Sequence, residues 1–109
     1  MRQKPVVRRR TADDDIESAI AYYFDEAGVE LAANFANRLE EALQKISRQP
    51  AIGSRRYGNI VDLPELRQWP MTKFPYLLFY IEKENHIELS RVLHTSMDIP
   101  PYLYDIDSF

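Results

Sequence analysis

Two consecutive apolar runs with helical spacing, separated by a single glycine, limit what this chain can fold into. The first run begins after Thr11 and ends near Ala27, and the second continues to about Arg48, where Pro50 stops it. Gly28 lies between them and predicts a C-cap. Because one residue separates the two helices, we expect a tight antiparallel hairpin. The buried faces are predicted at Ile16, Ala19, Ile20, Tyr23, Phe24 and Ala27, and at Leu31, Phe35, Leu39, Ala42, Leu43 and Ile46.

The start of the first helix carries an acidic cluster. Thr11 precedes Asp14 by three positions, which is the spacing of a capping box, so we expect the Thr11 side chain to accept a free backbone N–H. Asp13, Asp14 and Asp15 complement the positive end of the helix dipole. Helix stability therefore explains these carboxylates without any role in acid–base catalysis.

Strand patterns flank the helical hairpin. Residues 4–10 read as a short first strand, and residues 65–71, 76–83 and 87–94 read as three further strands, with a turn at 84–85. The predicted order is β-α-α-β-β-β. We therefore expect an α+β domain in which a small antiparallel sheet, including the N-terminal strand, carries the two-helix hairpin on one face.

Length and composition indicate one domain. A chain of 109 residues with 45% hydrophobic residues is long enough for a single core. We assign residues 1–97 to this domain and residues 98–109 to a C-terminal tail that is rich in aromatic side chains but has no clean period. The absence of cysteine excludes disulfides and thiolate sites, and no apolar run suggests a membrane span or a secretion signal. A cytoplasmic location is expected.

Charge is strongly segregated along the chain. Residues 1–10 hold five basic side chains and no carboxylate, whereas residues 11–37 hold seven carboxylates and no Lys or Arg. Residues 42–80 reverse the sign again, with six basic groups against two acidic ones. The net charge of −3 argues against general adhesion to nucleic acid. The turn-forming residues of 50–64 predict an exposed loop that carries Arg55, Arg56 and Tyr57.

No cofactor or metal is expected. The only histidines are His86 and His94, which is too few for a typical divalent metal site. Gly28, Gly53 and Gly58 do not match the spacing of a phosphate-binding loop.

A set of cations and aromatic residues is the remaining source of chemistry. Cleavage of RNA without a metal needs a base, a cation and an acid, and these residue types could supply all three. Arg91 and His94 are three apart on one strand, so their side chains should point to opposite faces unless a bulge intervenes. The alternative for Arg91 is a strand residue paired with a carboxylate, and for Trp69 and Tyr80 it is packing. The set comprises Arg56, Tyr57, Arg67, Trp69, Lys73, Tyr80, Arg91 and His94.

Several short motifs, in this order, resemble the ParE/RelE superfamily of toxins from bacterial toxin–antitoxin modules, on its ParE-like branch. The similarity covers about residues 4–100 and implies the strand order given above. The motifs are Asp15-Ile16, Tyr22-Tyr23, residues 35–43, Pro50, Gly53-Ser54, Pro64-Glu65-Leu66-Arg67, Phe74-Pro75-Tyr76 and Arg91-Val92-Leu93-His94.

The resemblance implies a small toxin that a cognate, ParD-like antitoxin neutralises by covering exposed apolar surface on the helices or the sheet. ParE-like members inhibit DNA gyrase, whereas RelE-like members cut mRNA on the ribosome, and some members have no toxicity. The acidic pI of about 5.4 favours the gyrase inhibitor, which is not an enzyme, because a ribosomal nuclease would be basic. The predicted target contact is Arg55, Arg56, Arg67, Trp69, Lys73 and Arg91, with the tail nearby. A RelE-like nuclease would instead use Arg91, His94, Tyr102 and Tyr104.

Overall fold

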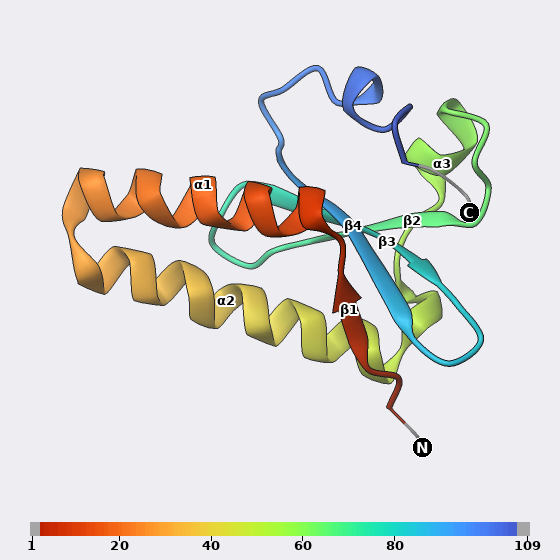
Figure 1. The fold of residues 1–109 in the computed structure, drawn as a ribbon, viewed down its shortest axis with the longest axis horizontal. Coiled ribbons are helices and arrows are strands. Elements are labelled where there is room, and N and C mark those ends of the chain that lie inside the picture. The colour runs from red at the N-terminus through yellow and green to blue at the C-terminus, as the bar shows by residue number, and fades with distance from the viewer. Residues whose placement is uncertain (1–2, 107–109) are drawn as a thin grey trace.

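The computed structural model describes residues 3–106 and contains a four-stranded sheet with two long helices on one face (Figure 1). The predicted order of the long helices and strands is confirmed. The elements are β1 (Val6–Arg8), α1 (Arg10–Ala27), α2 (Val29–Arg48), the 3₁₀ helix η1 (Pro50–Ile52), α3 (Arg56–Ile60), β2 (Leu66–Pro70), β3 (Tyr76–Glu82), β4 (Ile87–His94) and the 3₁₀ helix η2 (Pro100–Tyr102).

The sheet has the strand order β1-β4-β3-β2 and is mixed. Strands β2, β3 and β4 are antiparallel, as the hairpin patterns predicted. β1 instead joins the edge of β4 in parallel, with Arg8 opposite Leu89. The β3–β4 register shifts between Phe79 and Tyr80, which leaves Ser90 as an extra residue in β4.

The helical hairpin forms as predicted. Gly28 has a φ of 83°, and its N–H donates to the Phe24 carbonyl oxygen at 2.7 Å, which closes α1 and allows α2 to begin at the next residue. The two helices cover one face of the sheet around the fully buried Phe35. The prediction that Phe24 and Ala27 are buried is wrong, because the end of the hairpin projects past the sheet (Figure 1).

The predicted capping box is not formed. α1 begins two residues earlier than predicted, at Arg10, and its N-cap Arg9 makes no side-chain capping bond. Thr11 thus lies inside the first turn, where its hydroxyl donates to the Ser90 carbonyl oxygen at 2.9 Å. The Thr11 hydroxyl, which the local spacing predicted to cap the helix, therefore forms a tertiary hydrogen bond with β4.

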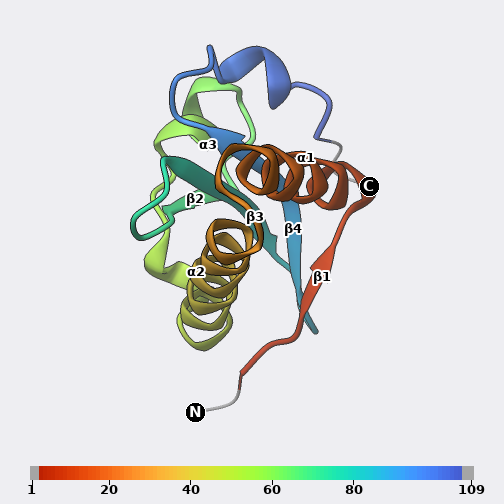
Figure 2. The same ribbon diagram turned by 90° about the vertical axis from the view of Figure 1, so that its left-hand side faces the viewer.

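The second face of the sheet is closed by α3 and the C-terminal segment. Figure 2 looks along α1 and α2 and shows α3 and this segment on one side of the molecule, away from α2. Ile99, Leu103 and Ile106 are buried against Phe79 and Leu93 of the sheet. The described part of the tail therefore contributes to the core, and it covers apolar surface of the sheet face, one of the two places where exposed apolar surface for an antitoxin was expected.

The predicted exposed loop at 50–64 contains two short helices. Tyr57 of α3 packs edge-on against Phe79, with ring centroids 5.6 Å apart. Gly58 lets α3 lie against the chain that leads into β2, since a Cβ there would collide with the Leu66 carbonyl oxygen and lie 2.6 Å from the Leu63 oxygen. Arg55 and Arg56 remain exposed, as predicted.

Within residues 3–106, no helix combines the length and apolar character that crossing a bilayer requires.

Candidate functional site

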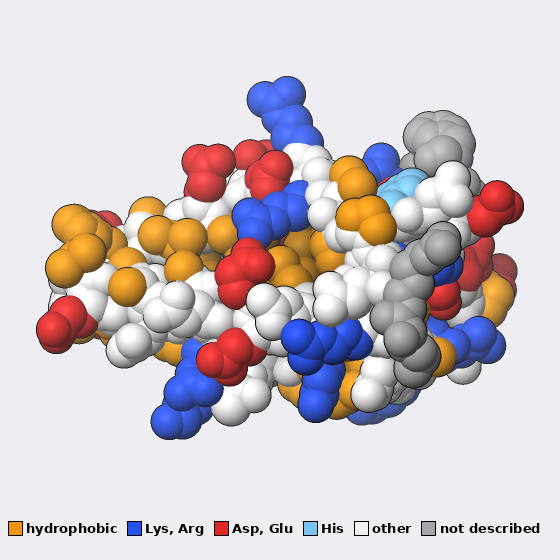
Figure 3. Space-filling model, turned by 90° about the horizontal axis from the view of Figure 1, so that it is seen from below, with side chains coloured by type: hydrophobic (Ala, Val, Ile, Leu, Met, Phe, Trp, Pro, Cys, Tyr) orange, Lys and Arg blue, Asp and Glu red, His pale blue; other side chains and the backbone are white. Residues whose placement is uncertain are grey.

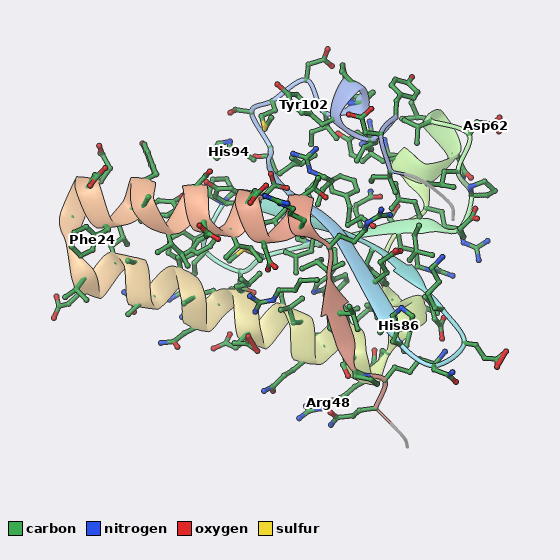
Figure 4. The ribbon with its side chains drawn as sticks, in the orientation of Figure 1. Phe24, Arg48, Asp62, His86, His94 and Tyr102 are labelled. Carbon is green, nitrogen blue, oxygen red and sulfur yellow. The ribbon has the colours of Figure 1, made fainter. Side chains whose placement is uncertain are left out.

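The sequence-predicted site residues lie in two separate regions. Arg91, His94 and Tyr102 gather where the end of β4 meets α1 and the C-terminal segment, and Figure 4 labels His94 and Tyr102 there. Arg56, Tyr57, Arg67 and Trp69 lie in α3 and β2, with Arg55 directly before α3 and Lys73 in the turn after β2. Strand β3 separates β4 from β2. The six predicted target-binding residues therefore do not form one site.

Arg91 is held by a carboxylate of α1. Its Nε and Nη2 atoms donate to the two carboxylate oxygens of Asp15, each at 2.8 Å, and both side chains are largely buried. The hydrogen bond that Arg91 donates to Asp15 raises the pKa of Arg91, so the guanidinium stays charged. This arrangement matches the interpretation of Arg91 as a strand residue paired with a carboxylate.

Asp15 also completes the edge of β4. β1 pairs with β4 only as far as Leu89, so β1 does not pair with the part of β4 that follows Leu89. The Val92 N–H donates to Asp15 Oδ2 at 2.9 Å, and Thr11 bonds the Ser90 carbonyl one turn earlier. Two side chains of α1 thus replace backbone partners that β1 does not supply.

Arg91 and His94 line the same shallow hollow of about 340 Å³, together with Tyr22 and Met97. They do so although they lie on different sides of β4, because His94 packs against Tyr76 whereas Arg91 also donates to the Tyr102 carbonyl oxygen of the C-terminal segment. Arg91 reaches over the edge of β4 to α1, so it leaves the sheet sideways and does not stand over one face. The Tyr102 ring lies 5.8 Å from the Arg91 guanidinium carbon.

The ring of His94 is anchored to its own turn. The Ser96 N–H donates to His94 Nδ1 at 3.0 Å, and the ring packs edge-on against Tyr76 with centroids 5.1 Å apart. Nδ1 therefore acts as an acceptor, and in the neutral ring the proton is on Nε2. Burial raises the pKa of Tyr76 to about 12, which keeps that phenol protonated near neutral pH. Tyr104 is 65% exposed.

Arg67 and Tyr80 brace the turn at η1. Arg67 Nη1 donates to the Gly53 carbonyl oxygen at 2.8 Å and to the Ala51 oxygen at 3.2 Å. The buried Tyr80 hydroxyl donates to the Pro50 carbonyl at 2.7 Å and accepts from the Gly53 N–H at 2.9 Å. Both side chains thus have structural partners, and burial raises the pKa of Tyr80.

Trp69 connects two hollows beside β2. One, of about 430 Å³, also contains Arg56, whose guanidinium lies 5.7 Å from the Tyr57 ring. The other, of about 460 Å³, is lined by Lys45 and Arg48 of α2. We call Arg55, Arg56, Trp69 and Lys73, with Lys45 and Arg48, the basic group. Sequence reasoning missed the last two because they lie on a helix far from β2 in the chain.

Residues 3–106 contain no cluster of three or more His, Asp or Glu side chains suited to hold a metal ion.

The comparisons with known proteins agree with this architecture. Residues 6–99 match the family model described as the ParE toxin of type II toxin-antitoxin system, parDE. A solved structure, the chromosomal ParDE TA system from P. aeruginosa, superposes with a TM-score of 0.70 at 17% sequence identity, over 84% of this chain and 96% of that chain. At this identity the structural likeness shows the fold alone. No curated protein matches the chain significantly.

Proposed function

Because this chain belongs to the ParE toxin family of type II toxin–antitoxin systems, we propose that it inhibits DNA gyrase and that a cognate, ParD-like antitoxin holds it inactive. The family match over residues 6–99 carries this proposal. We further propose that the protein acts in the cytoplasm, needs no cofactor and arrests growth when the antitoxin is lost.

The state of Arg91 and His94 favours an inhibitor over a nuclease. A nuclease needs a cation that is free to approach the phosphate and a base that is free to take a proton. Arg91 is bound at two nitrogens by Asp15, and His94 Nδ1 accepts from Ser96. Neither group is prepared for that chemistry.

We propose that the basic group contacts the gyrase–DNA complex. Of the six residues predicted from sequence, Arg67 and Arg91 are engaged within the protein, whereas Arg55, Arg56 and Lys73 are exposed. Reversal of charge at Arg56 should weaken inhibition of gyrase several-fold, since interfacial charges mainly affect association. Reversal at Arg10, an exposed cation outside the basic group, is the matched control. Equal inhibition by both variants would remove Arg56 from the contact.

Inhibition of gyrase is tested by supercoiling of relaxed plasmid with purified protein freed from its antitoxin. Loss of supercoiling in proportion to the added protein supports the proposal. Unchanged supercoiling by folded protein would contradict it. Adding the product of the adjacent antitoxin gene should restore supercoiling, and failure to do so would contradict the proposed neutralisation.

One observation favours ribosome-dependent mRNA cleavage as a second function. Arg91 and His94 share one hollow, and Tyr102 lies against Arg91. Rearrangement on the ribosome that frees Arg91 from Asp15 would assemble a cation, an imidazole and a phenol. Cleavage of mRNA on purified ribosomes, abolished by His94→Ala, would support this alternative. A family member without toxicity would show neither activity.

A further inference from the structure

The tip of the α1–α2 hairpin exposes three large apolar side chains. Tyr22 is 56% exposed, Phe24 is 54% exposed and Val29 is 68% exposed. Figure 4 labels Phe24 at the end of the hairpin that lies farthest from the sheet, and Figure 3 shows hydrophobic side chains gathered over this end of the molecule. Gly28 joins the two helices with no intervening loop, so Phe24 and Val29 both belong to the residues that flank this junction. An apolar cluster at such a projecting end is typical of a protein-binding surface.

The rim of this tip is acidic. Asp25, Glu26 and Glu30 are exposed around the apolar residues, and no Lys or Arg occurs between Thr11 and Asn37. We call Tyr22, Phe24 and Val29 with these three carboxylates the acidic tip. Its surface therefore combines an apolar centre with a negative border, and the complementary surface has an apolar centre with Lys and Arg around it.

A lipid surface does not fit this chemistry. Anionic membranes attract basic amphipathic segments and repel carboxylates. Enzymes that hold DNA, in contrast, present Lys and Arg to the phosphates, so a DNA-holding enzyme offers basic surface of the required sign.

We propose that the acidic tip binds basic, DNA-facing surface of gyrase, an inference that rests on the inhibition of gyrase proposed above. The hairpin end that carries the acidic tip projects past the sheet (Figure 1), whereas Lys45 and Arg48 of the basic group line a hollow with Trp69 of β2. The acidic tip and the basic group are therefore separate surfaces of the molecule. Tip and basic group can therefore touch protein and bound DNA at the same time. Contact through the rim should be salt-dependent, since exposed charges are screened by ions.

The experiment measures binding of immobilised DNA gyrase holoenzyme to the purified, antitoxin-free protein at low and at high salt. One variant removes the rim charges with Asp25→Asn, Glu26→Gln and Glu30→Gln, and a second replaces the apolar anchor with Phe24→Ser. All four side chains are exposed, so both variants should fold, which circular dichroism checks. A control variant removes three exposed carboxylates outside the hairpin, with Glu65→Gln, Glu84→Gln and Asp98→Asn.

Each rim charge should contribute about a factor of two, so the rim variant should bind gyrase roughly eightfold more weakly at low salt. The difference should shrink at high salt. Phe24→Ser should weaken binding at both salt concentrations, and the control variant should bind like the wild type.

Binding of both tip variants at wild-type strength, while the wild-type protein inhibits gyrase, would overturn the tip assignment and leave the proposed function intact. Failure of the wild-type protein to bind or inhibit gyrase would instead overturn the proposed function together with this inference. Tip variants that keep gyrase binding but lose either antitoxin binding or self-association in sedimentation would assign the tip to that partner and overturn the proposal.

Discussion

Replacement of Asp15 by Ala should be the most damaging single change to the edge of β4. The substitution removes three accepted hydrogen bonds at 2.8 to 2.9 Å, two from Arg91 and one from the Val92 N–H. The Arg91 side chain is 16% exposed, so an unpaired guanidinium would regain only part of its hydration. Breaking a buried ion pair costs about 3–5 kcal/mol, and this residual exposure favours the low end.

We therefore expect Asp15→Ala to lower the free energy of unfolding by about 3 kcal/mol, a large share of the roughly 5–15 kcal/mol that such domains possess. For a chain of this size, the midpoint of thermal unfolding should fall by roughly 12–20 °C. Urea and thermal unfolding, followed by circular dichroism, measure both quantities. Asp14→Ala, an exposed carboxylate one residue earlier, should cost less than about 0.5 kcal/mol.

The double variant Asp15→Ala, Arg91→Met identifies the cause of the loss. If most of it comes from the unpaired cation, the double variant should be more stable than Asp15→Ala alone. A loss below about 1 kcal/mol in Asp15→Ala, or a double variant that is no more stable than the single one, would refute the reasoning.

Three further changes test other parts of the structure. Tyr80→Phe removes the hydroxyl that bridges β3 and the turn at η1, and urea unfolding should show a loss of about 2 kcal/mol because a buried N–H loses its acceptor. Gly58→Ala forces a Cβ against two backbone oxygens and should cost about 1–3 kcal/mol; an unchanged midpoint would contradict that contact. The pKa of Tyr76 is raised from 10.0 to about 12 in the folded state, so its stabilisation is complete below pH 10 and is lost as the pH rises through 12. Tyr76→Phe should therefore unfold less steeply in alkaline titrations than the wild type, and identical profiles would disprove this.

Local patterns in the sequence were sufficient for the main elements. The spacing of apolar residues around Gly28 predicts the hairpin, because the period of a buried helical face and the stop signals at glycine and proline are properties of neighbouring residues. Strands β3 and β4 begin at the predicted residues for the same reason. α3 was missed because five residues are too few to show a period.

Features set by tertiary contacts could not be predicted in this way. Local rules predicted that Thr11 caps the helix and that Asp15 complements the helix dipole. In the structure both side chains form hydrogen bonds with β4, which lies more than 70 residues away in sequence. The two residues are one turn apart on α1, beside its buried face. That spacing was the only indication in the sequence that both could contact the same neighbouring element. Ile99 and Leu103 lie in a tail where prolines, aspartates and aromatic residues obscure any clean period, and they are buried because one face of the sheet would otherwise be open.

The sequence did not predict which of the candidate site residues lie together in the structure. Alternation along a strand separates Arg91 from His94, but a side chain at a strand edge can leave the sheet sideways, and Arg91 does so. Lys45 and Arg48 were not predicted to join the basic group, because α2 and β2 are far apart in the sequence and lie together only in the folded structure.

The central claim is tested most directly by two cleavage assays with one preparation of antitoxin-free protein. One assay measures cleavage of plasmid DNA in the presence of gyrase, and the other measures cleavage of mRNA on ribosomes. Our account predicts that gyrase and supercoiled plasmid will accumulate linear, cleaved DNA as the protein is added, and that mRNA on translating ribosomes will stay intact. Intact plasmid together with cut mRNA would contradict the account, and would make Arg91, His94 and Tyr102 a catalytic group.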